Sequence, residues 1–329
     1  MNAKPESRSG SASPPGAAPR RKMQVDADGV IHIDAFELPI SAALSPEARQ
    51  AQINALLHSE LGLAPFADVT SEAEFIAEVD KARRQLDEKF LGPLAGALLA
   101  AFPVAIAPGE IAGVPVEVFT PAAEADPDRI LINLHGGAYF CGAIHGGRVE
   151  AIPVANLARI KVVSVDYRQG YEHKHPAATE DVVAVYRELL KSHSPQNIGI
   201  YGGSAGGRLT AQVVARLIHE GVPPPAAAGV FGSGAGGVGD AAYFGKIGMG
   251  EPPPPASAPE EIFPVQMRSE AFGYFAGVAV NDPWAAPLHA PPEVLAKFPP
   301  TLFITATRAF DMSQATLFHR ALSRAGAEA

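Results

Sequence analysis

The sequence predicts an α/β fold in which helices cover both faces of a mostly parallel, doubly wound sheet. Short apolar runs typical of buried strands alternate with amphipathic helical patterns through residues 104–329. Two glycine-rich turns, at residues 135–137 and 202–207, directly follow such apolar runs. Ligands in folds of this class bind beyond the carboxyl ends of the strands, so these turns are candidates for the functional site.

The segment before the core is predicted to contain a disordered tail and a helical cap. Residues 1–24 are rich in Ser, Pro, Ala and basic residues, and no apolar stretch typical of a secretory signal follows them. Residues 25–103 carry some β character at residues 29–33 and then two helical patterns, which begin near Ser45 and Thr70. We expect this helical segment to lie over a site, with a helical surface decoration as the alternative.

The core is expected to begin near Val104. Residues 113–120 alternate like an antiparallel edge strand. Residues 232–285 interrupt the pattern with a Gly- and Pro-rich sequence, which predicts a second piece of the cap or a loop insertion. The remaining strands are expected at residues 128–134, 161–166, 198–201, 226–231 and 301–307, and the helices at residues 151–160, 181–191, 208–219 and 312–325.

The composition excludes several classes of protein. With 47% hydrophobic and 19% charged residues, the chain has the composition of a soluble globular protein, and its net charge of -9 argues against a nucleic acid partner. Its one cysteine, Cys141, provides neither a disulfide framework nor a cysteine-based metal site, and is expected to be a small buried side chain. Pro93 and Pro103 interrupt the longest apolar run, so no membrane span is expected. The expected location is cytoplasmic.

The sequence Gly202-Gly-Ser-Ala-Gly206 fits the G-x-S-x-G pattern of a nucleophile elbow. It lies between an apolar run and a helical pattern, which is the context that a strand-turn-helix elbow needs. Glycines on either side of Ser204 remove Cβ atoms where a strand and a helix pass close together. A phosphate-binding turn is the alternative, but neither common phosphate-binding glycine pattern is present here.

The turn His135-Gly136-Gly137 is a candidate oxyanion loop. Acyl transfer builds negative charge on a carbonyl oxygen, which needs backbone N–H groups arranged in advance. Gly136, Gly137 and Ala205 are the candidate donors, with a plain glycine turn as the alternative. His135 precedes the serine within this loop, so we expect it to stabilise the loop and not to act as a base.

An acidic partner for the serine should follow a later strand. Asp311 comes after the strand expected at residues 301–307, although a helix N-cap would explain it as well. Asp282 is the second candidate; it ranks below Asp311 because it precedes that strand and does not follow it.

Together these motifs resemble hormone-sensitive-lipase-like carboxylesterases, which are α/β-hydrolases of the acetyl-esterase type. The resemblance implies a serine esterase that lies under a helical cap. Such an enzyme hydrolyses small-molecule esters with short-to-medium acyl chains through an acyl-enzyme, and it uses no cofactor or metal. The resemblance also implies Ser204 as the nucleophile, Asp311 as the acid and Gly136, Gly137 and Ala205 as the oxyanion donors. The motifs that carry the resemblance, in order, are His135-Gly-Gly, Asp166-Tyr-Arg168, Pro176-Ala-Ala178, Gly202-Gly-Ser-Ala-Gly-Gly207, Asp282-Pro283 and Phe310-Asp311.

The chain departs from the family pattern in three ways. Ala138 stands where a third glycine is usual, and Gly203 where Asp is common. The family's catalytic histidine follows the acid, whereas here only His319 does, inside an expected helix. We therefore expect a chain truncated before the last strand and its histidine, or, as the alternative, a non-catalytic hydrolase-derived binding protein without the base. Truncation would leave residues 301–307 as an exposed apolar edge at which a homodimer could form.

Overall fold

The structure, a computed structural model, describes residues 23–25, 31–33, 39–58, 69, 71–143, 145–236, 272–307, 309 and 311–329. It divides into two compact units, Met1–Gln50 and Ala51–Ala329, and each is described by itself. Of the predicted second cap piece at residues 232–285, the part from 237 to 271 lies outside the described residues. The predicted disordered tail, residues 1–24, lies outside them as well, apart from Met23 and Gln24.

In the first unit a short antiparallel pair joins β1 (Met23–Val25) to β2 (Ile31–Ile33). Its second strand falls within residues 29–33, where the sequence has β character. The helix α1 (Pro46–His58) begins where the sequence predicts, and the Ser45 hydroxyl accepts the Ala48 N–H at 3.2 Å. This side-chain acceptor satisfies one of the N–H groups that the first turn of a helix leaves free.

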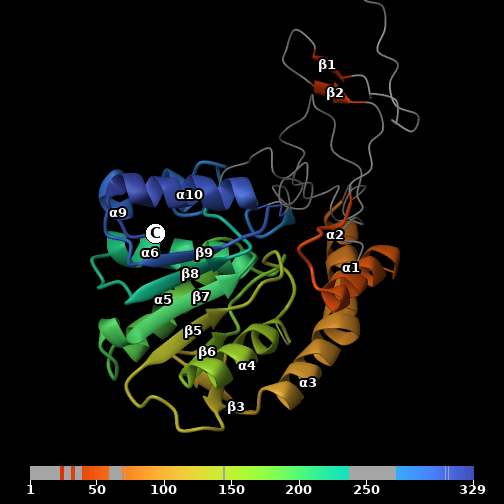
Figure 1. Ribbon diagram of the computed structural model, residues 1–329. Helices are drawn as coiled ribbons and strands as arrows, with labels where there is room; N and C mark the ends of the chain where they lie inside the picture. The colour runs from red at the N-terminus through yellow and green to blue at the C-terminus, as the bar shows by residue number, and fades with distance from the viewer. Residues whose placement is uncertain are drawn as a thin grey trace, which may run out of the picture. The chain divides into compact units, whose positions relative to one another are not determined.

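The second unit is built on a seven-stranded sheet in the order β3-β4-β6-β5-β7-β8-β9 (Figure 1). From β6 to β9 all neighbours are parallel, while β3, β4 and β6 pair antiparallel. This arrangement confirms the mostly parallel sheet. The strands are β3 (Val104–Ile111), β4 (Val114–Pro121), β5 (Ile130–Leu134), β6 (Lys161–Val165), β7 (Ile198–Gly203), β8 (Ala227–Phe231) and β9 (Thr301–Ile304).

Residues 113–120 do not form the edge strand that their pattern predicts. Residues 114–120 lie within β4, between β3 and β6, and β3 forms the edge. A tight turn at Ala112 and Gly113, both with positive φ, joins the two strands into a hairpin. The strand β3 contains Pro108, which has no N–H to donate and is tolerated at a sheet edge.

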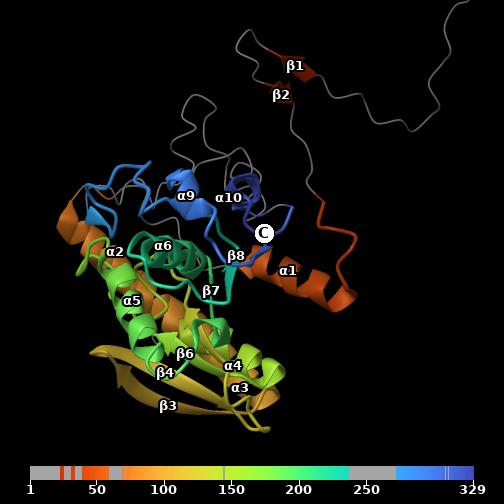
Figure 2. The ribbon, with the colours of Figure 1, turned by 90° about the vertical axis from the view of Figure 1, so that its left-hand side faces the viewer.

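Helices cover both faces of the sheet, because its strands present apolar side chains on both sides (Figure 2). One face carries α5 (Ala177–Leu189), α6 (Ala205–His219) and α10 (Met312–Ala325), and the other carries α4 (Gly146–Ala158). Ile132 and Ile200 are buried on the first face, and Val162 and Tyr201 on the second. The shorter helical turns are η3 (Pro195–Asn197), η5 (Pro287–His289) and α9 (Pro292–Leu295).

A helical run before the core consists of α2 (Glu72–Arg84), a π-helical segment η2 (Gln85–Leu91) and α3 (Gly92–Ala101). The Ser71 hydroxyl caps α2 by accepting the Glu74 N–H at 3.3 Å. Buried Phe75 and Val79 of α2 pack against Phe140, in the loop after β5. The run therefore contacts the part of the core that holds the predicted oxyanion loop. That it caps a substrate site remains a prediction.

Within the described ranges, no helix is both long and apolar enough to cross a membrane.

Candidate active site

Ser204 lies at the turn between β7 and α6 in a strained backbone conformation. Its φ of 52° and ψ of −120° lie outside the regions favoured by residues with a Cβ atom. Such a conformation costs on the order of 1–3 kcal/mol and persists only where the surroundings hold it in place. Here the Ser204 N–H donates to the carbonyl of Phe231 at 2.7 Å, at the end of β8. The geometry is that of the nucleophile elbow predicted from G-x-S-x-G.

The glycines of the elbow allow α6 to start directly against the end of β5. A Cβ atom on Gly206 would lie 1.7 Å from the carbonyl oxygen of Leu134, and one on Gly202 would lie 2.2 Å from the same oxygen. No side chain fits at either position without moving the backbone. The spacing of glycines in the motif is therefore a packing requirement of this turn.

The Ser204 side chain is exposed, and in the described part of the chain its hydroxyl forms no hydrogen bond with a histidine. Ala205 opens α6, so its N–H has no partner within the helix. The positive end of the helix dipole at this point favours developing negative charge.

The predicted oxyanion loop is a tight turn after β5. The carbonyl of Gly137 accepts the N–H groups of Phe140 and Cys141, both at 3.0 Å. Gly137 has a φ of 133°, and a Cβ atom there would lie 1.9 Å from the Cys141 carbonyl oxygen, so this position requires glycine. Ala138 and Tyr139 also have positive φ values, of 51° and 61°, which are uncommon for residues with a side chain.

The three predicted oxyanion donors differ in their hydrogen bonds. The Gly136 N–H donates to Glu150 Oε1 at 2.9 Å, so it is engaged in this structure. The N–H groups of Gly137 and Ala205 donate to no acceptor among the described residues. These two N–H groups remain available for an oxyanion.

His135 is buried and supports the loop, in agreement with the role expected from its position. Its ring stacks on Tyr167 with centroids 4.3 Å apart, and its Nδ1 lies 2.8 Å from the Gly136 carbonyl oxygen. The Tyr167 hydroxyl donates to the His135 carbonyl at 2.6 Å. Burial lowers the pKa of His135 to about 4, so the ring is neutral at pH 7 and its Nδ1–H donates to Gly136.

Asp311 is 2% exposed and accepts the Thr305 hydroxyl at 2.8 Å. It occupies the N-cap position of α10, but its side chain makes no capping hydrogen bond. The N-cap interpretation therefore does not account for the carboxylate. Asp311 follows β9 and Ser204 follows β7, and β8 separates these parallel strands.

The other two candidates have different surroundings. Asp282 Oδ1 accepts the N–H groups of Trp284 at 2.8 Å and Ala285 at 3.0 Å, which is the hydrogen bonding of an Asx turn. His319 lies on an exposed position of α10 with its ring 5.8 Å from that of Phe303.

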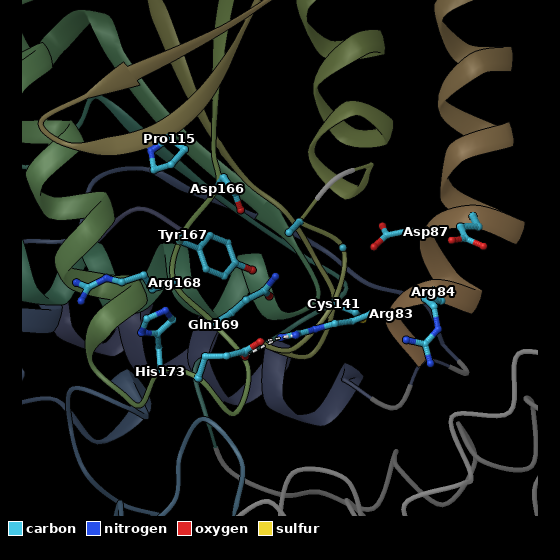
Figure 3. A pocket seen from close by; sticks show the side chains of 14 residues that line it. Arg83, Arg84, Asp87, Pro115, Cys141, Asp166, Tyr167, Arg168, Gln169 and His173 are labelled. Atoms are coloured by element: carbon cyan, nitrogen blue, oxygen red, sulfur yellow. Dashed lines mark hydrogen bonds and ion pairs between the residues drawn. The ribbon is translucent and has the colours of Figure 1, made fainter. Parts of the chain in front are cut away.

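A separate pocket of about 500 Å³ lies between the helical run and the strand ends (Figure 3). Neither Ser204 nor Asp311 lines it. Arg83 lines this pocket and donates to both carboxylate oxygens of Glu172, at 2.5 and 2.9 Å, and to the Phe140 carbonyl at 2.5 Å. Its lining residues are Arg83, Arg84, Asp87, Glu88, Pro115, Cys141, Gly142, Ala143, Asp166, Tyr167, Arg168, Gln169, Glu172 and His173.

Two buried acceptors in this pocket, Asp87 Oδ1 and Gln169 Oε1, have no hydrogen-bond partner among the residues that the structure describes. They can accept hydrogen bonds from water or from a small polar molecule. Burial raises the pKa of Asp87 and raises that of the Cys141 thiol to about 12. Cys141 therefore lacks the thiolate character of a nucleophile. In the described ranges no group of three or more His, Cys, Asp or Glu side chains is placed to hold a metal ion.

Glu150, which no motif in the sequence indicates, contacts both the oxyanion loop and the elbow. Its Oε2 accepts the Gly203 N–H at 3.2 Å, in addition to the bond from Gly136 to Oε1. One signal in the sequence could have drawn attention to it. Glu150 precedes an apolar helical stretch, Ala151-Ile-Pro-Val-Ala155, in a helix that packs on the sheet.

Comparison with known proteins identifies the same region. A family model described as the alpha/beta hydrolase fold matches residues 131–329. A versiconal hemiacetal acetate esterase of Emericella nidulans is 31% identical over 112 residues, which cover 34% of this chain and 39% of that protein. The chain spans about two-fifths of the length of the curated relatives that it matches.

Solved structures agree over a longer span. The crystal structure of an esterase is 28% identical with a TM-score of 0.72, covering 90% of this chain and 87% of that one. An esterase of the bacterial hormone-sensitive lipase family shares the fold, with a TM-score of 0.64 and 24% identity over 87% of this chain and 86% of that one. These matches confirm the resemblance to hormone-sensitive-lipase-like carboxylesterases.

Proposed function

Because the chain belongs to the α/β-hydrolase family, we propose that it is a serine carboxylic-ester hydrolase that works through an acyl-enzyme. One observation carries the proposal: Ser204 stands on a strained elbow beside two N–H groups, of Gly137 and Ala205, that are not hydrogen bonded within the described residues. A positioned nucleophile and oxyanion donors arranged in advance are two of the parts that acyl transfer needs.

In the proposed reaction, Ser204 Oγ attacks the carbonyl carbon of the ester and its proton passes to a base. The N–H groups of Gly137 and Ala205 stabilise the oxyanion of the tetrahedral intermediate. The intermediate collapses, the alcohol leaves with a proton, and the acyl group stays on Ser204 until water hydrolyses it. The Gly136 N–H can join the oxyanion hole only by leaving Glu150.

Asp311 is the proposed acid that orients the base, because it is buried at the strand end expected for that role. The base itself is not identified: among the described residues, no side chain that could act as a base is hydrogen bonded to Ser204. An oxyanion hole acting without the base still gives on the order of 10³–10⁴-fold catalysis over water, which sets the lower bound of the expected activity.

The proposed substrates are small esters with short-to-medium acyl chains. The relatives with esterase names motivate this choice, since one of them is named for an acetate ester. We also propose that the chain self-associates along β9, where Leu302 is 58% exposed and Ile304 is 53% exposed. Exposed apolar strands at a sheet edge tend to pair with another chain.

The test is covalent labelling of the chain with a fluorophosphonate, read by intact mass, alongside hydrolysis of p-nitrophenyl acetate and butyrate. We expect one adduct on the wild-type chain, located at Ser204 by peptide mapping, and none on Ser204→Ala. Ester turnover should be low, near the bound set by an oxyanion hole without its base, and should disappear in the same variant. A folded wild-type chain that accepts no label and turns over no ester would overturn the proposal. Saturable ester binding without turnover would then favour the non-catalytic alternative.

A further inference from the structure

The Glu150 carboxylate lies between the two loops that carry the proposed chemistry. It belongs to α4, which begins a few residues after the oxyanion loop and packs against the sheet on the face opposite α6. The Gly136 N–H donates to Oε1 at 2.9 Å, and the Gly203 N–H donates to Oε2 at 3.2 Å. One side chain thus joins the residue before Gly137 to the residue before Ser204.

The carboxylate is itself held in place from the sheet. Asn133 Nδ2 donates to Glu150 Oε2 at 2.9 Å, and the Ser164 hydroxyl donates to Asn133 Oδ1 at 2.9 Å. Asn133 and Ser164 are buried on adjacent strands, β5 and β6. Because three donors converge on the two carboxylate oxygens, the position of Glu150 is determined by groups on three elements of the core.

The Glu150 carboxylate fills the space beside Gly203, and Gly136 lies close to Ser204. A Cβ atom on Gly203 would lie 2.9 Å from Glu150 Oε1, and one on Gly136 would lie 3.3 Å from the Ser204 Cβ atom. Glu150 therefore occupies the space that a side chain preceding Ser204 would need. A carboxylate placed at position 203 could reach this space only in the absence of Glu150.

We propose that Glu150 is a positioning residue that fixes the oxyanion loop relative to the nucleophile elbow through the N–H groups of Gly136 and Gly203. The proposal rests on the function proposed above for Ser204. Gly136 and Gly203 are bound to one carboxylate. The residues that follow them, Gly137 in the loop and Ser204 in the elbow, therefore keep a fixed separation. That separation determines how well an oxyanion hole fits the carbonyl that Ser204 attacks.

The test compares Glu150→Gln with a matched control, Glu117→Gln. Glutamine keeps the shape of Glu150 but presents an NH₂ group to backbone donors, so one of the two loops loses its acceptor. Glu117, on β4, forms an ion pair with Arg148, which lies on α4 as Glu150 does, and among the described residues its carboxylate is hydrogen bonded to Arg148 alone. We expect kinact for fluorophosphonate labelling of Ser204 to fall about tenfold in Glu150→Gln with KI unchanged, and the control to label within about twofold of the wild type.

A rescue experiment separates positioning from general structural support. Glu150→Ala should label slowly, and adding Gly203→Asp should restore most of the rate, because the new carboxylate enters the vacated space. In the wild-type background, Gly203→Asp should slow labelling, since its Cβ atom would meet Glu150. A double variant no faster than Glu150→Ala would contradict the proposal.

Amide hydrogen exchange tests Glu150 independently of any activity. In the wild-type chain the Gly136 amide should exchange at least about tenfold more slowly than the Gly137 amide, and Glu150→Ala, which removes both carboxylate oxygens, should remove the difference. Equal exchange at Gly136 and Gly137 in the wild type overturns the inference even where a variant fails to fold. If Ser204 takes no label but this difference is found, the proposed function fails and the role of Glu150 in holding the two loops stands. If Ser204 labels at the wild-type rate in folded Glu150→Gln, the positioning role fails and the proposed function stands.

Discussion

The contact between α6 and β5 predicts that Gly206→Ala destabilises the chain, although alanine is a better helix former than glycine. The added Cβ atom would lie 1.7 Å from the Leu134 carbonyl oxygen and 2.8 Å from the His135 carbonyl oxygen. Ordinary van der Waals contact begins at 3.4 Å, so the first turn of α6 has to move away from β5. Both obstructing atoms belong to the backbone and cannot rotate aside.

The two opposing effects can be compared in magnitude. Alanine gains up to about 1 kcal/mol of helix propensity over glycine. Overpacking of a core by one methyl group costs about 1–3 kcal/mol, and more where the backbone must shift. We therefore expect a net loss of up to about 2 kcal/mol in the free energy of unfolding. In a domain of this size a loss of about 2 kcal/mol lowers Tm by about 4–8 °C.

The assay is thermal unfolding followed by circular dichroism, with Gly96→Ala as the matched control. Gly96 lies on an exposed position of α3, and a Cβ atom there meets nothing within 4 Å. The control should gain about 0.5–1 kcal/mol, which raises Tm by a few degrees. If Gly206→Ala lowers Tm and Gly96→Ala raises it, the close approach of α6 to the end of β5 is established. A Gly206→Ala chain that melts at or above the wild-type temperature would refute the reasoning.

Three further predictions concern other parts of the chain. Burial lowers the pKa of His135 from 6.5 to about 4, so the native state excludes a proton that the unfolded state binds. The contribution of His135 to the free energy of unfolding is therefore complete above pH 6.5 and falls, by up to about 3 kcal/mol, as the pH drops towards 4. Urea titrations at pH 7 and 5 measure this loss, and equal stabilities would contradict it. Because burial raises the pKa of Cys141 to about 12, iodoacetamide at pH 8 should alkylate the unfolded chain and spare the native one, as judged by mass spectrometry; rapid alkylation of the native chain would count against the buried site. Leu302→Lys and Ile304→Lys should each weaken self-association in sedimentation velocity, whereas a wild-type chain that stays monomeric at high concentration would exclude pairing through β9.

The local geometry that the sequence predicts for the two turns depends on neighbours along the chain. The strained Ser204 turn follows from glycines within two residues of it, because each glycine meets an obstacle next to the same turn. Gly137 likewise meets the carbonyl of Cys141, four residues later. Local patterns therefore specify the elbow and the shape of the loop.

The parts that the sequence did not reveal depend on contacts between distant segments. Gly136 appears in the sequence as an oxyanion donor, but its N–H is engaged by Glu150, which reaches the loop only because α4 packs on the sheet beside it. The edge position of β3 was missed for a similar reason. Pro108 weakens its strand pattern, and the pairing with β4 that makes it a strand is a tertiary contact.

The π-helical segment Gln85–Leu91 determines which faces of two helices point inward. A π-turn contains an extra residue relative to an α-helical turn, and one residue corresponds to a rotation of about 100° around a helix axis. The face of α2 that carries Phe75 meets the oxyanion loop, and α3 packs on α4 after the π-helical segment. Deleting a single residue from this segment would turn one of these faces away from its partner. The relative orientation of the inward faces of α2 and α3 is thus specified by the seven-residue length of the π-helical segment, and not by the composition of either helix.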